Sequence, residues 1–429
     1  MEKERAPLAP YRVLDLTDES GVFCTKILAA LGADVIRIEP PEGHPTRRIG
    51  PFYHNEPDPE KSLHWFTYNL NKRSVTLNIE CATGQELFKR MVKTADFMVE
   101  CFRPGYLDKL GLGYAILSAL NPRLVQTSIT PFGATGPYNQ FKGSNLVMSA
   151  ASGYLYLCGD AERPPVQCAT PLAWYHTGLE ATTFTMMAHW YRQRTGQGQQ
   201  IDVSAQESFM SQALPDLLFW KSHGWLTQRS ADGRNVAATP AQAATLAHAA
   251  RPAQAARPAH RTIVKCQDGY VLFSIRPYLK EIREWMASEG MAEGPFQKEW
   301  DDLILKKLTP SPGQQHHIYD LVEAFALKHT GDELMWGAQK RGIEVAKVQN
   351  VRDVMEDTHL KERGYFVQVA HPELKDTITY GGSPFKSDEM SWGYQRRAPF
   401  IGEHNQAIYA GELGLSKQEL AILKEGGVI

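Results

Sequence analysis

Short apolar runs alternate with amphipathic segments along the first part of the chain. The apolar run Tyr11–Leu16 is followed by a turn, by the helical pattern Val22–Leu31 and by a second apolar run, Asp34–Glu39. A strand, a helix and a strand within about thirty residues are typical of the right-handed crossover unit of a parallel sheet. The opening pattern therefore predicts an α/β fold.

The alternation continues to roughly residue 140. Three further apolar runs are separated by helical patterns, and each is short enough to be a single strand. The runs are Ser74–Asn78, Ala95–Glu100 and Leu124–Ile129, and helices are expected at Gln85–Thr94 and Leu117–Asn121. This order predicts a doubly wound domain, in which helices cover both faces of a parallel sheet.

A different pattern follows in the middle of the chain. Residues 145–194 predict helices on either side of a loop at Gly159–Thr170, and residues 208–226 predict another helix. The segment Ala237–Arg261 is dominated by Ala, Pro, Gln and His, which favours a flexible connection over a helix.

A further domain is expected to begin at Thr262. Asp268-Gly269 has the composition of a hairpin turn between two short strands. The stretch 278–360 is predicted to be helical and Gly364–Phe385 to be rich in strands, before two short helices at the end.

The overall composition excludes several classes of protein. The 429 residues carry a formal net charge of −2, and no apolar run approaches the roughly 18 residues that cross a bilayer. Neither a nucleic-acid-binding nor a membrane protein is predicted. The charged first residues do not resemble a secretory signal, and the six cysteines show no Cys-x-x-Cys spacing. We therefore expect free thiols, no bound metal and a cytoplasmic location.

Several short motifs occur in order along almost the whole chain. They are Val35–Pro40, Asn69–Ser74, Ala95–Glu100 with Phe102–Gly105, Phe132–Pro137, Pro171–Leu179, Thr195–Gln199, Arg341–Ile343, His359–Leu360 and Gly402–His404. Together they resemble the motifs of the class III CoA-transferase family. The resemblance runs from about residue 11 to the end, and residues 235–261 are the unmatched exception.

The resemblance implies a Rossmann-like large domain built from both chain ends plus a smaller α+β domain. Residues 1–200 are expected to form the N-terminal part of the large domain, and residues 201–330 a linker and the start of the small domain. Residues 331–385 would complete the small domain, and residues 386–429 would return to the large one. The resemblance also implies an interlaced dimer of two ring-shaped subunits.

One position departs from the family's pattern. Where the strip resembling Pro171–Leu179 has an Asp whose carboxylate is the family's nucleophile, this chain has Trp174. An indole offers only an N–H donor and cannot attack a thioester. Trp174 is interpreted either as filling the former acyl pocket of an inactive site or as shaping an active pocket. The nearest acids in sequence, Asp160 and Glu180, do not align with the nucleophile.

Coenzyme A or an acyl-CoA is the substrate that the resemblance implies, with no covalently bound cofactor. No catalytic residue is assigned to this chain. Residues that border CoA in the family are carried over where the motifs match, and arginines are included because Arg pairs well with phosphate. The candidates are Glu19, Arg37, Pro40, Arg73, Leu77, Arg103, Lys109, Leu110 and Phe132. Each arginine is alternatively an ordinary surface charge that binds no phosphate. The turn Asp18–Gly21 is acidic and therefore unfavourable for phosphate.

Some class III enzymes are heteromers in which only one type of subunit carries the Asp. We therefore expect a homologous, Asp-bearing partner subunit, and CoA transfer from a donor such as succinyl-CoA to a carboxylic acid, with benzylsuccinate as a suggested acceptor. The alternatives are a CoA-binding or purely structural homodimer and an acyl-CoA racemase or isomerase. A nicotinamide-dependent dehydrogenase is disfavoured, because the first turn has Gly21 where the dinucleotide fingerprint needs three glycines.

Overall fold

The computed structural model describes residues 6–159, 163–230, 233–238, 262–291, 297–306 and 311–429. The chain divides into two compact units. The first comprises Met1–Tyr154, Gln167–Ala213 and Thr358–Ile429, and the second comprises Leu155–Val166 and Leu214–Asp357. Both chain ends therefore belong to the first unit. The chain returns to this unit at Thr358, earlier than the expected return at residue 386.

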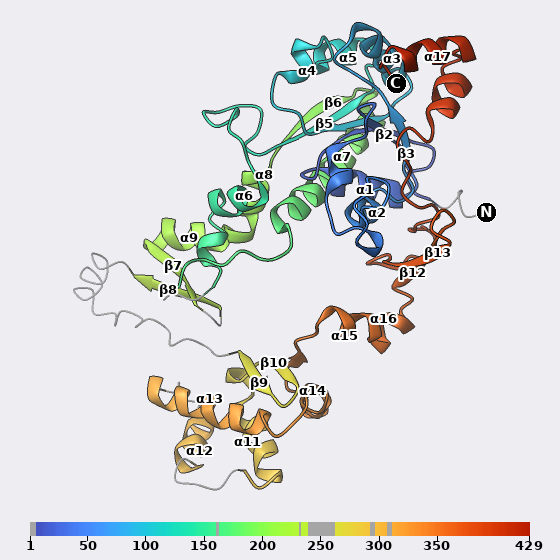
Figure 1. Ribbon diagram of the computed structural model, residues 1–429. Helices are drawn as coiled ribbons and strands as arrows, with labels where there is room; N and C mark the ends of the chain where they lie inside the picture. Colours follow the sequence, from blue (N-terminus) through green and yellow to red (C-terminus); the bar gives the residue numbers. More distant parts are fainter. Residues whose placement is uncertain (1–5, 160–162, 231–232, 239–261, 292–296, 307–310) are drawn as a thin grey trace. The chain divides into compact units, whose positions relative to one another are not determined.

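Six parallel strands form the sheet of the first unit, in the order β3-β2-β1-β4-β5-β6 (Figure 1). Their bounds are β1 Arg12–Leu16, β2 Asp34–Glu39, β3 Arg73–Thr76, β4 Phe97–Glu100, β5 Val125–Thr130 and β6 Gln199–Ser204. The order reverses between β1 and β4, as in doubly wound dinucleotide-binding domains. The predicted parallel α/β sheet is confirmed, although its sixth strand lies beyond the first 140 residues.

Helices connect these strands and cover the sheet. The α-helices of the first unit are α1 Val22–Ala30, α2 Leu63–Tyr68, α3 Ala82–Val92, α4 Tyr106–Lys109, α5 Tyr114–Leu120, α6 Asn145–Ala151, α7 Leu172–Thr195, α8 Ala205–Met210, α16 Thr358–Glu362 and α17 Lys417–Glu425. Shorter turns of helix are η2 Pro45–Arg48, η3 Tyr53–Asn55 and η5 Ser211–Ala213, and η7 Gln406–Glu412 is a π-helix.

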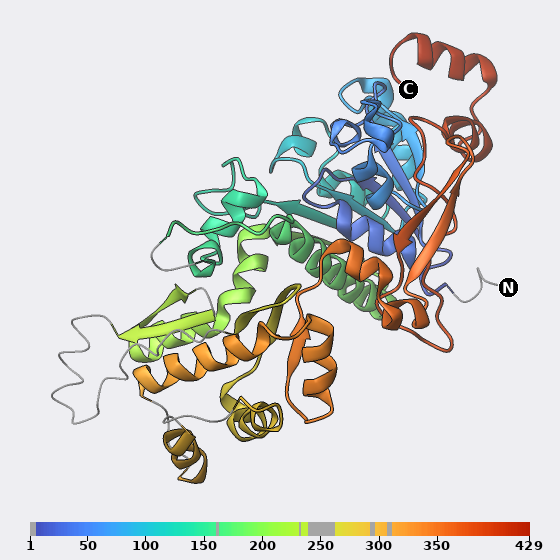
Figure 2. The same ribbon diagram turned by 60° about the horizontal axis from the view of Figure 1, so that its bottom comes forward.

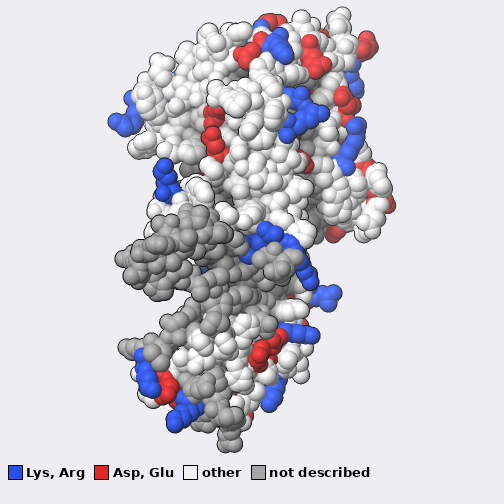
Figure 3. Space-filling view, turned by 90° about the vertical axis from the view of Figure 1, so that its left-hand side faces the viewer, with Lys and Arg blue, Asp and Glu red and all other residues white. Residues whose placement is uncertain are grey.

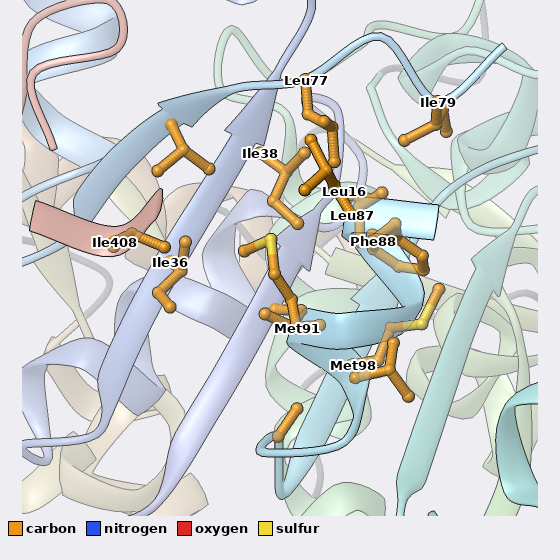
Figure 4. Close-up of a cluster of buried hydrophobic side chains, with 14 of the residues drawn as sticks. Leu16, Ile36, Ile38, Leu77, Ile79, Leu87, Phe88, Met91, Met98 and Ile408 are labelled. Atoms are coloured by element: carbon orange, nitrogen blue, oxygen red, sulfur yellow. The ribbon is translucent and has the colours of Figure 1, made fainter. Parts of the chain in front are cut away.

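Alternate residues of each strand point to opposite faces of the sheet, and both faces are apolar. On one face, Ile36 and Met98 pack with Phe88 and Met91 of α3 (Figure 4). Ile408, from the other end of the chain, belongs to the same core. Burial of this face therefore requires both ends of the sequence, which explains why neither end forms a domain alone.

The opposite face takes the neighbouring residues of the same strands. Val13, Val35 and Phe97 pack with Leu28 of α1 and Ala181 of α7. Helix α7 is the long green helix of Figure 2. Because α1 and α7 cover this face and α3 the other, the sheet is buried on both sides, and its strands read as continuous apolar runs.

The C-terminal segment is fastened to β3. Asn405 accepts a hydrogen bond from the Thr76 N–H at 2.9 Å and donates one to the Thr76 hydroxyl at 2.7 Å, and the Tyr409 hydroxyl donates to the Thr76 carbonyl at 2.8 Å. Before it, β12 Phe366–His371 and β13 Asp376–Gly381 form an antiparallel hairpin. This hairpin confirms the strand-rich segment predicted there.

The second unit has its own core around a three-stranded antiparallel sheet of order β11-β10-β9. The pairing of Cys266 with Gly269 confirms the predicted hairpin. Trp285 and Phe325 are central residues of this core. The elements are η4 Leu155–Leu157, α9 Leu214–His223, β7 Trp225–Ser230, β8 Gly233–Ala238, β9 Ile263–Cys266, β10 Gly269–Phe273, η6 Arg276–Tyr278, α11 Leu279–Ser288, α12 Gln297–Leu305, α13 Pro312–Ala326, α14 Gly331–Gln339, β11 Val345–Lys347 and α15 Val351–Glu356.

The helix predicted over residues 208–226 is wrong in extent. Helix α9 ends at His223, Gly224 follows with a left-handed φ of 62°, and Trp225 begins β7. A glycine in this conformation is a common way to end a helix.

The segment Ala237–Arg261 was predicted to be a flexible connection. Its first two residues, Ala237 and Ala238, end β8, and residues 239–261 lie outside the described residues. No helix in the described ranges is long and apolar enough to cross a membrane.

Candidate functional site

The carboxyl ends of β1 and β4 meet at the topological switch point of the sheet, where doubly wound domains bind their ligands. After β1 the chain turns through Asp18 and Gly21 into α1, and after β4 it passes Cys101. A Cβ atom on Gly21 would lie 2.5 Å from the Cys101 Sγ. Any larger residue would force the two turns apart, so glycine is required here.

The side chains at the switch point are acidic. Glu100 ends β4 and is buried, and it accepts a hydrogen bond from the Phe102 N–H at 2.7 Å. Burial raises the pKa of Glu100 to about 7, and Asp18 and Asp202 act in the same direction. Glu19 is exposed in the turn after β1. These groups repel phosphate and leave hydrogen-bonding atoms suited to a neutral part of a ligand.

Two of the candidate arginines are held inside the protein. Arg37 is fully buried and donates to the Asp15 carboxylate at 2.8 Å and to the Thr17 hydroxyl at 3.1 Å. Arg73 bonds to Asp34 at 2.8 Å and to Glu412 at 2.6 Å. Both cations are neutralised by carboxylates of the first unit, so their contacts are structural.

Arg103 and Lys109 are the two exposed basic candidates; Arg103 precedes α4, and Lys109 is its last residue. In the part of the chain that the structure describes, neither forms an ion pair. Figure 3 shows one face of the molecule on which basic and acidic side chains are interspersed with wide uncharged areas.

The apolar candidates lie in different surroundings. Leu77 is in the core of the first unit, and Leu110 is half-buried against that core. Pro40 is half-buried after β2. Phe132 is half-buried and packs against the cluster that contains Trp174. Phe132 is thus the one of the nine candidates that packs against the cluster around Trp174.

Trp174 is the third residue of α7 and is only 4% exposed. It packs in an apolar cluster with Met148, Ala173, Ala205 and Phe209. This cluster joins the starts of α7 and α8 to α6, so the indole is fixed by three helices.

The start of α7 is capped from outside the helix. Its first turn follows Pro171, which provides no capping side chain, and the Ala173 N–H is satisfied by the Asn145 side chain at 3.0 Å. The Trp174 Nε1 atom is buried and has no hydrogen-bond partner in the described structure. A buried, unpaired donor costs about 1–3 kcal/mol, and it can be satisfied by an acceptor on a ligand.

The acids nearest in sequence do not replace the missing carboxylate. Asp160 lies outside the described residues. Glu180 lies 3.9 Å from the Nδ1 atom of His176, one helical turn before it. His176 in turn bonds to the side chains of Gln212 at 2.6 Å and Ser208 at 3.3 Å. In the described ranges, no group of three His, Cys, Asp or Glu side chains is arranged as metal ligands.

A second cluster at the start of α7 was not predicted from the sequence. The Tyr175 ring lies 5.4 Å from the Phe23 ring of α1, and its hydroxyl bonds to the hydroxyl of Tyr68. Lys26 lies among the same aromatic rings. The close approach of α7 to α1 depends on Gly178, where a Cβ atom would lie 2.9 Å from the Phe23 Cβ. Nothing in the periodicity of α1 marks Lys26, because the signal is purely tertiary.

Comparisons with known proteins identify the family of the chain. The family model of CoA-transferase family III matches residues 8–405. The chain therefore belongs to CoA-transferase family III.

Individual relatives are similar over nearly their whole length. The BbsE subunit of succinyl-CoA:(R)-benzylsuccinate CoA-transferase from Thauera aromatica is 34% identical, with 98% of this chain and 97% of the relative covered. Formyl-CoA:oxalate CoA-transferase from Streptomyces avermitilis is 31% identical, with 98% and 99% covered. The crystal structure of a CAIB/BAIF family protein from Brucella suis is 26% identical, with a TM-score of 0.76 and with 94% and 99% covered.

Proposed function

We propose that this chain is the subunit of a heteromeric class III CoA-transferase that lacks the nucleophile, and that a homologous subunit supplies the Asp. The observation that carries the proposal is Trp174, which occupies the nucleophile's place in the motif and is buried in an apolar cluster. The relative from Thauera aromatica is itself named as a subunit, which supports a divided enzyme.

The proposed reaction moves CoA from a donor such as succinyl-CoA to a carboxylic acid such as benzylsuccinate. The partner's carboxylate attacks the thioester carbonyl and forms a mixed anhydride as the CoA thiolate leaves. The thiolate then attacks the enzyme-side carbonyl and releases the donor acid, which leaves an enzyme–CoA thioester that transfers CoA to the acceptor. Trp174 cannot perform the first step, because its indole has no lone pair to offer.

We assign the remaining residues of this chain to binding. Arg103 and Lys109 would contact the phosphates of CoA, because they are exposed cations without an ion pair in the described structure. Leu110 and Pro40 would border the adenine, and Phe132 the acyl end near Trp174. Glu19 would face the pantetheine amides. Arg37, Arg73 and Leu77 would act indirectly, by supporting the strands beneath the site.

The assembly proposed is the interlaced dimer that the family resemblance implies, here between unlike subunits. Native mass spectrometry of the complex purified from its source, followed by denaturing analysis of its chains, tests this directly. A second, homologous chain with Asp at the position of Trp174 is the expected result. A homodimer of this chain with full transferase activity would overturn the proposal.

The substitution Trp174→Asp tests the role of the position. If the rest of the site is intact, the variant should acquire slow transferase activity in the absence of the partner subunit. Trp174→Asn is the matched control, because the Asn side chain has nearly the same volume as Asp but no carboxylate nucleophile. Equal activity of both variants would show that the carboxylate at this position is not what the chain lacks.

A second candidate, a structural subunit that binds no CoA, is favoured by one observation. The acidic switch point formed by Asp18, Glu19 and Glu100 is unfavourable for an anionic ligand. Titration of the purified chain with CoA separates the two candidates. Saturable binding that is weakened by Lys109→Met, but not by Lys93→Met at another exposed position, supports the CoA-binding subunit.

A further inference from the structure

Lys26 of α1 is a half-buried cation to which no described residue supplies a counter-charge. Its Nζ atom lies 6.0 Å from the ring centre of Phe23, 5.4 Å from that of Tyr68 and 5.6 Å from that of Tyr394. Among the described residues it has neither a hydrogen bond nor an ion pair. Cation–π attraction at such distances is weak, so the rings surround the ammonium group without neutralising it.

The neighbouring polar groups also lack acceptors. The hydroxyls of Tyr68 and Tyr175 bond to each other, which uses one O–H of the two and leaves the other free to donate. The ring of His64 lies 4.7 Å from that of Tyr68, and its buried Nδ1 atom has no partner in the described structure. The cluster therefore combines an ammonium group and an unused phenolic O–H, both of which are donors.

A carboxylate is the complement of this set. It brings a negative charge and about four lone-pair positions, and bonds from charged donors to it are stronger than those between neutral groups. The rings of Phe23, Tyr68, Tyr175 and Tyr394 offer an apolar surface beside these donors. A carboxylic acid with an apolar body would satisfy both parts of the cluster.

We propose that Lys26, Tyr68 and Tyr175 form a binding site for the carboxylate of an organic acid with an apolar body. Tyr175 directly follows Trp174 on α7, so the backbone that carries the site is continuous with the position of the family's nucleophile, although the two side chains pack in different clusters. We assign it to recognition of the acceptor acid. Only this last assignment rests on the proposed transferase, because the carboxylate site follows from the cluster itself.

The protonation of Lys26 gives the site a direct readout. Burial lowers the pKa of Lys26 to about 8, and the nearby Lys72 ammonium acts in the same direction. The other titratable groups at the cluster are His64 and the phenols of Tyr68, Tyr175 and Tyr394. A bound carboxylate stabilises the ammonium form, so it must raise the pKa of Lys26.

The experiment is competitive labelling of lysines with acetic anhydride at a series of pH values, read by mass spectrometry on the full-length protein. The probes are 3-phenylpropanoate and benzylsuccinate, and 3-phenylpropanamide is the uncharged control. We expect Lys26 to titrate near its lowered pKa without a probe, and the pKa to rise by about one unit or more with a carboxylate, as an opposite charge at close range produces. The amide should leave the curve unchanged.

Variants test the same site by calorimetric titration of the probes. Lys26→Met should weaken carboxylate binding by about tenfold or more, Lys26→Arg should retain part of it, and Tyr175→Phe should weaken it less. Lys93→Met, at an exposed position, should leave binding unchanged. An unshifted Lys26 titration with both carboxylates, or equal binding of 3-phenylpropanamide, would overturn the proposal.

The two proposals fail separately. Labelling and calorimetry need neither CoA nor a partner subunit. A shifted Lys26 in a chain that proves to have no transferase partner would keep the carboxylate site and remove the transferase assignment. If the complex is an active heteromer but neither acid shifts the pKa of Lys26, the proposed transferase stands and the carboxylate site is ruled out.

Discussion

Burial lowers the pKa of two lysines of the first unit to the same value, but their hydrogen-bond surroundings are opposite. Burial lowers the pKa of Lys72 to about 8, although its Nζ atom bonds to Asp15 at 2.8 Å, Thr25 at 2.8 Å and Asn69 at 3.0 Å. The pKa of Lys26 is also about 8, yet this residue has no such partner in the described structure. A perturbed pKa therefore does not distinguish a structural group from a binding group, whereas the number of satisfied hydrogen bonds does.

The region around Lys72 is a closed network. Asp15 accepts from both Lys72 and Arg37, and these cations hold its pKa well below its usual range despite complete burial. In contrast, two groups near the start of α7 have no partner among the described residues: the ammonium of Lys26 on α1 and the N–H of Trp174 on α7. In native proteins such unsatisfied groups are rare, and they are found most often where a ligand or partner completes them.

The largest effect that would test this contrast is expected for Lys72→Met. Removing the ammonium group leaves the buried Asp15 carboxylate with the Arg37 cation and the bonds from Thr17, and breaking a buried ion pair from one side costs about 3–5 kcal/mol. Urea unfolding at neutral pH should show a loss of this size. The exposed Lys93→Met should change the free energy of unfolding by less than about 0.5 kcal/mol. Equal stability of the two variants would mean that the network contributes little.

Glu100 is a buried acid whose ionised form is destabilised by burial, in contrast to Asp15, whose ionised form is stabilised by two cations. Its pKa in the folded protein, about 7, lies above the ordinary value of 4.5, so its contribution to stability is full below pH 4.5 and is lost as the pH rises through 7. Glu100→Gln mimics the protonated acid and should match the wild type at pH 4. At pH 8 it should be more stable by on the order of 2–3 kcal/mol.

Chemical denaturation at several pH values measures this difference. Glu86→Gln is the matched control, because Glu86 is exposed on α3 and pairs with Lys89. A wild type and a Glu100→Gln variant with parallel stability curves from pH 4 to pH 8 would show that Glu100 is ionised normally.

Two buried tryptophans sharpen the contrast further. Trp65 donates its Nε1–H to the Pro399 carbonyl at 3.0 Å and stacks against Arg47, whereas Trp174 donates to no group in the described structure. Their burial is similar, at 1% and 4% exposed. Trp65→Phe should therefore cost about 0.5–1.5 kcal/mol more than Trp174→Phe, because it removes one hydrogen bond to the Pro399 carbonyl, which keeps its bond from Arg47 at 2.9 Å. Equal losses in thermal or urea unfolding would imply that Trp174 Nε1 has a partner in the folded protein.

The sequence was sufficient for the layers of the fold. The runs Tyr11–Leu16 and Asp34–Glu39 become β1 and β2 nearly residue for residue, because strands buried on both faces are continuously apolar. The position of Trp174 at the start of a helix was also clear, from the helical pattern after Pro171. The break before β7 was missed, since Gly224 alone separates the end of α9 at His223 from the start of β7 at Trp225.

The site was less predictable, because its chemistry depends on contacts between distant residues. Arg37 and Arg103 have equal claims to phosphate in the sequence, but Asp15 neutralises the first and no described carboxylate pairs with the second. Lys26 was not recognised at all. Its significance comes from what is missing around it, and an absent counter-ion cannot be read from periodicity or composition.

The smallest effect on stability is expected for Lys26→Met, and it is the counterpart of the Lys72 experiment. No ion pair is broken, and the methionine stem can lie among the same rings, so the free energy of unfolding at pH 7 should stay within about 1 kcal/mol of the wild type or rise. The dependence on pH has a definite sign. The pKa of Lys26 is about 8 in the folded protein and 10.5 in the unfolded chain, so between pH 8 and pH 10.5 the unfolded wild type binds more protons than the folded one. The wild type should therefore gain stability relative to Lys26→Met as the pH rises from 8 to 10.5. Urea unfolding across this range measures the gain. A loss at pH 7 as large as that of Lys72→Met would show that Lys26 has a structural partner after all, and the distinction between the two lysines would not hold.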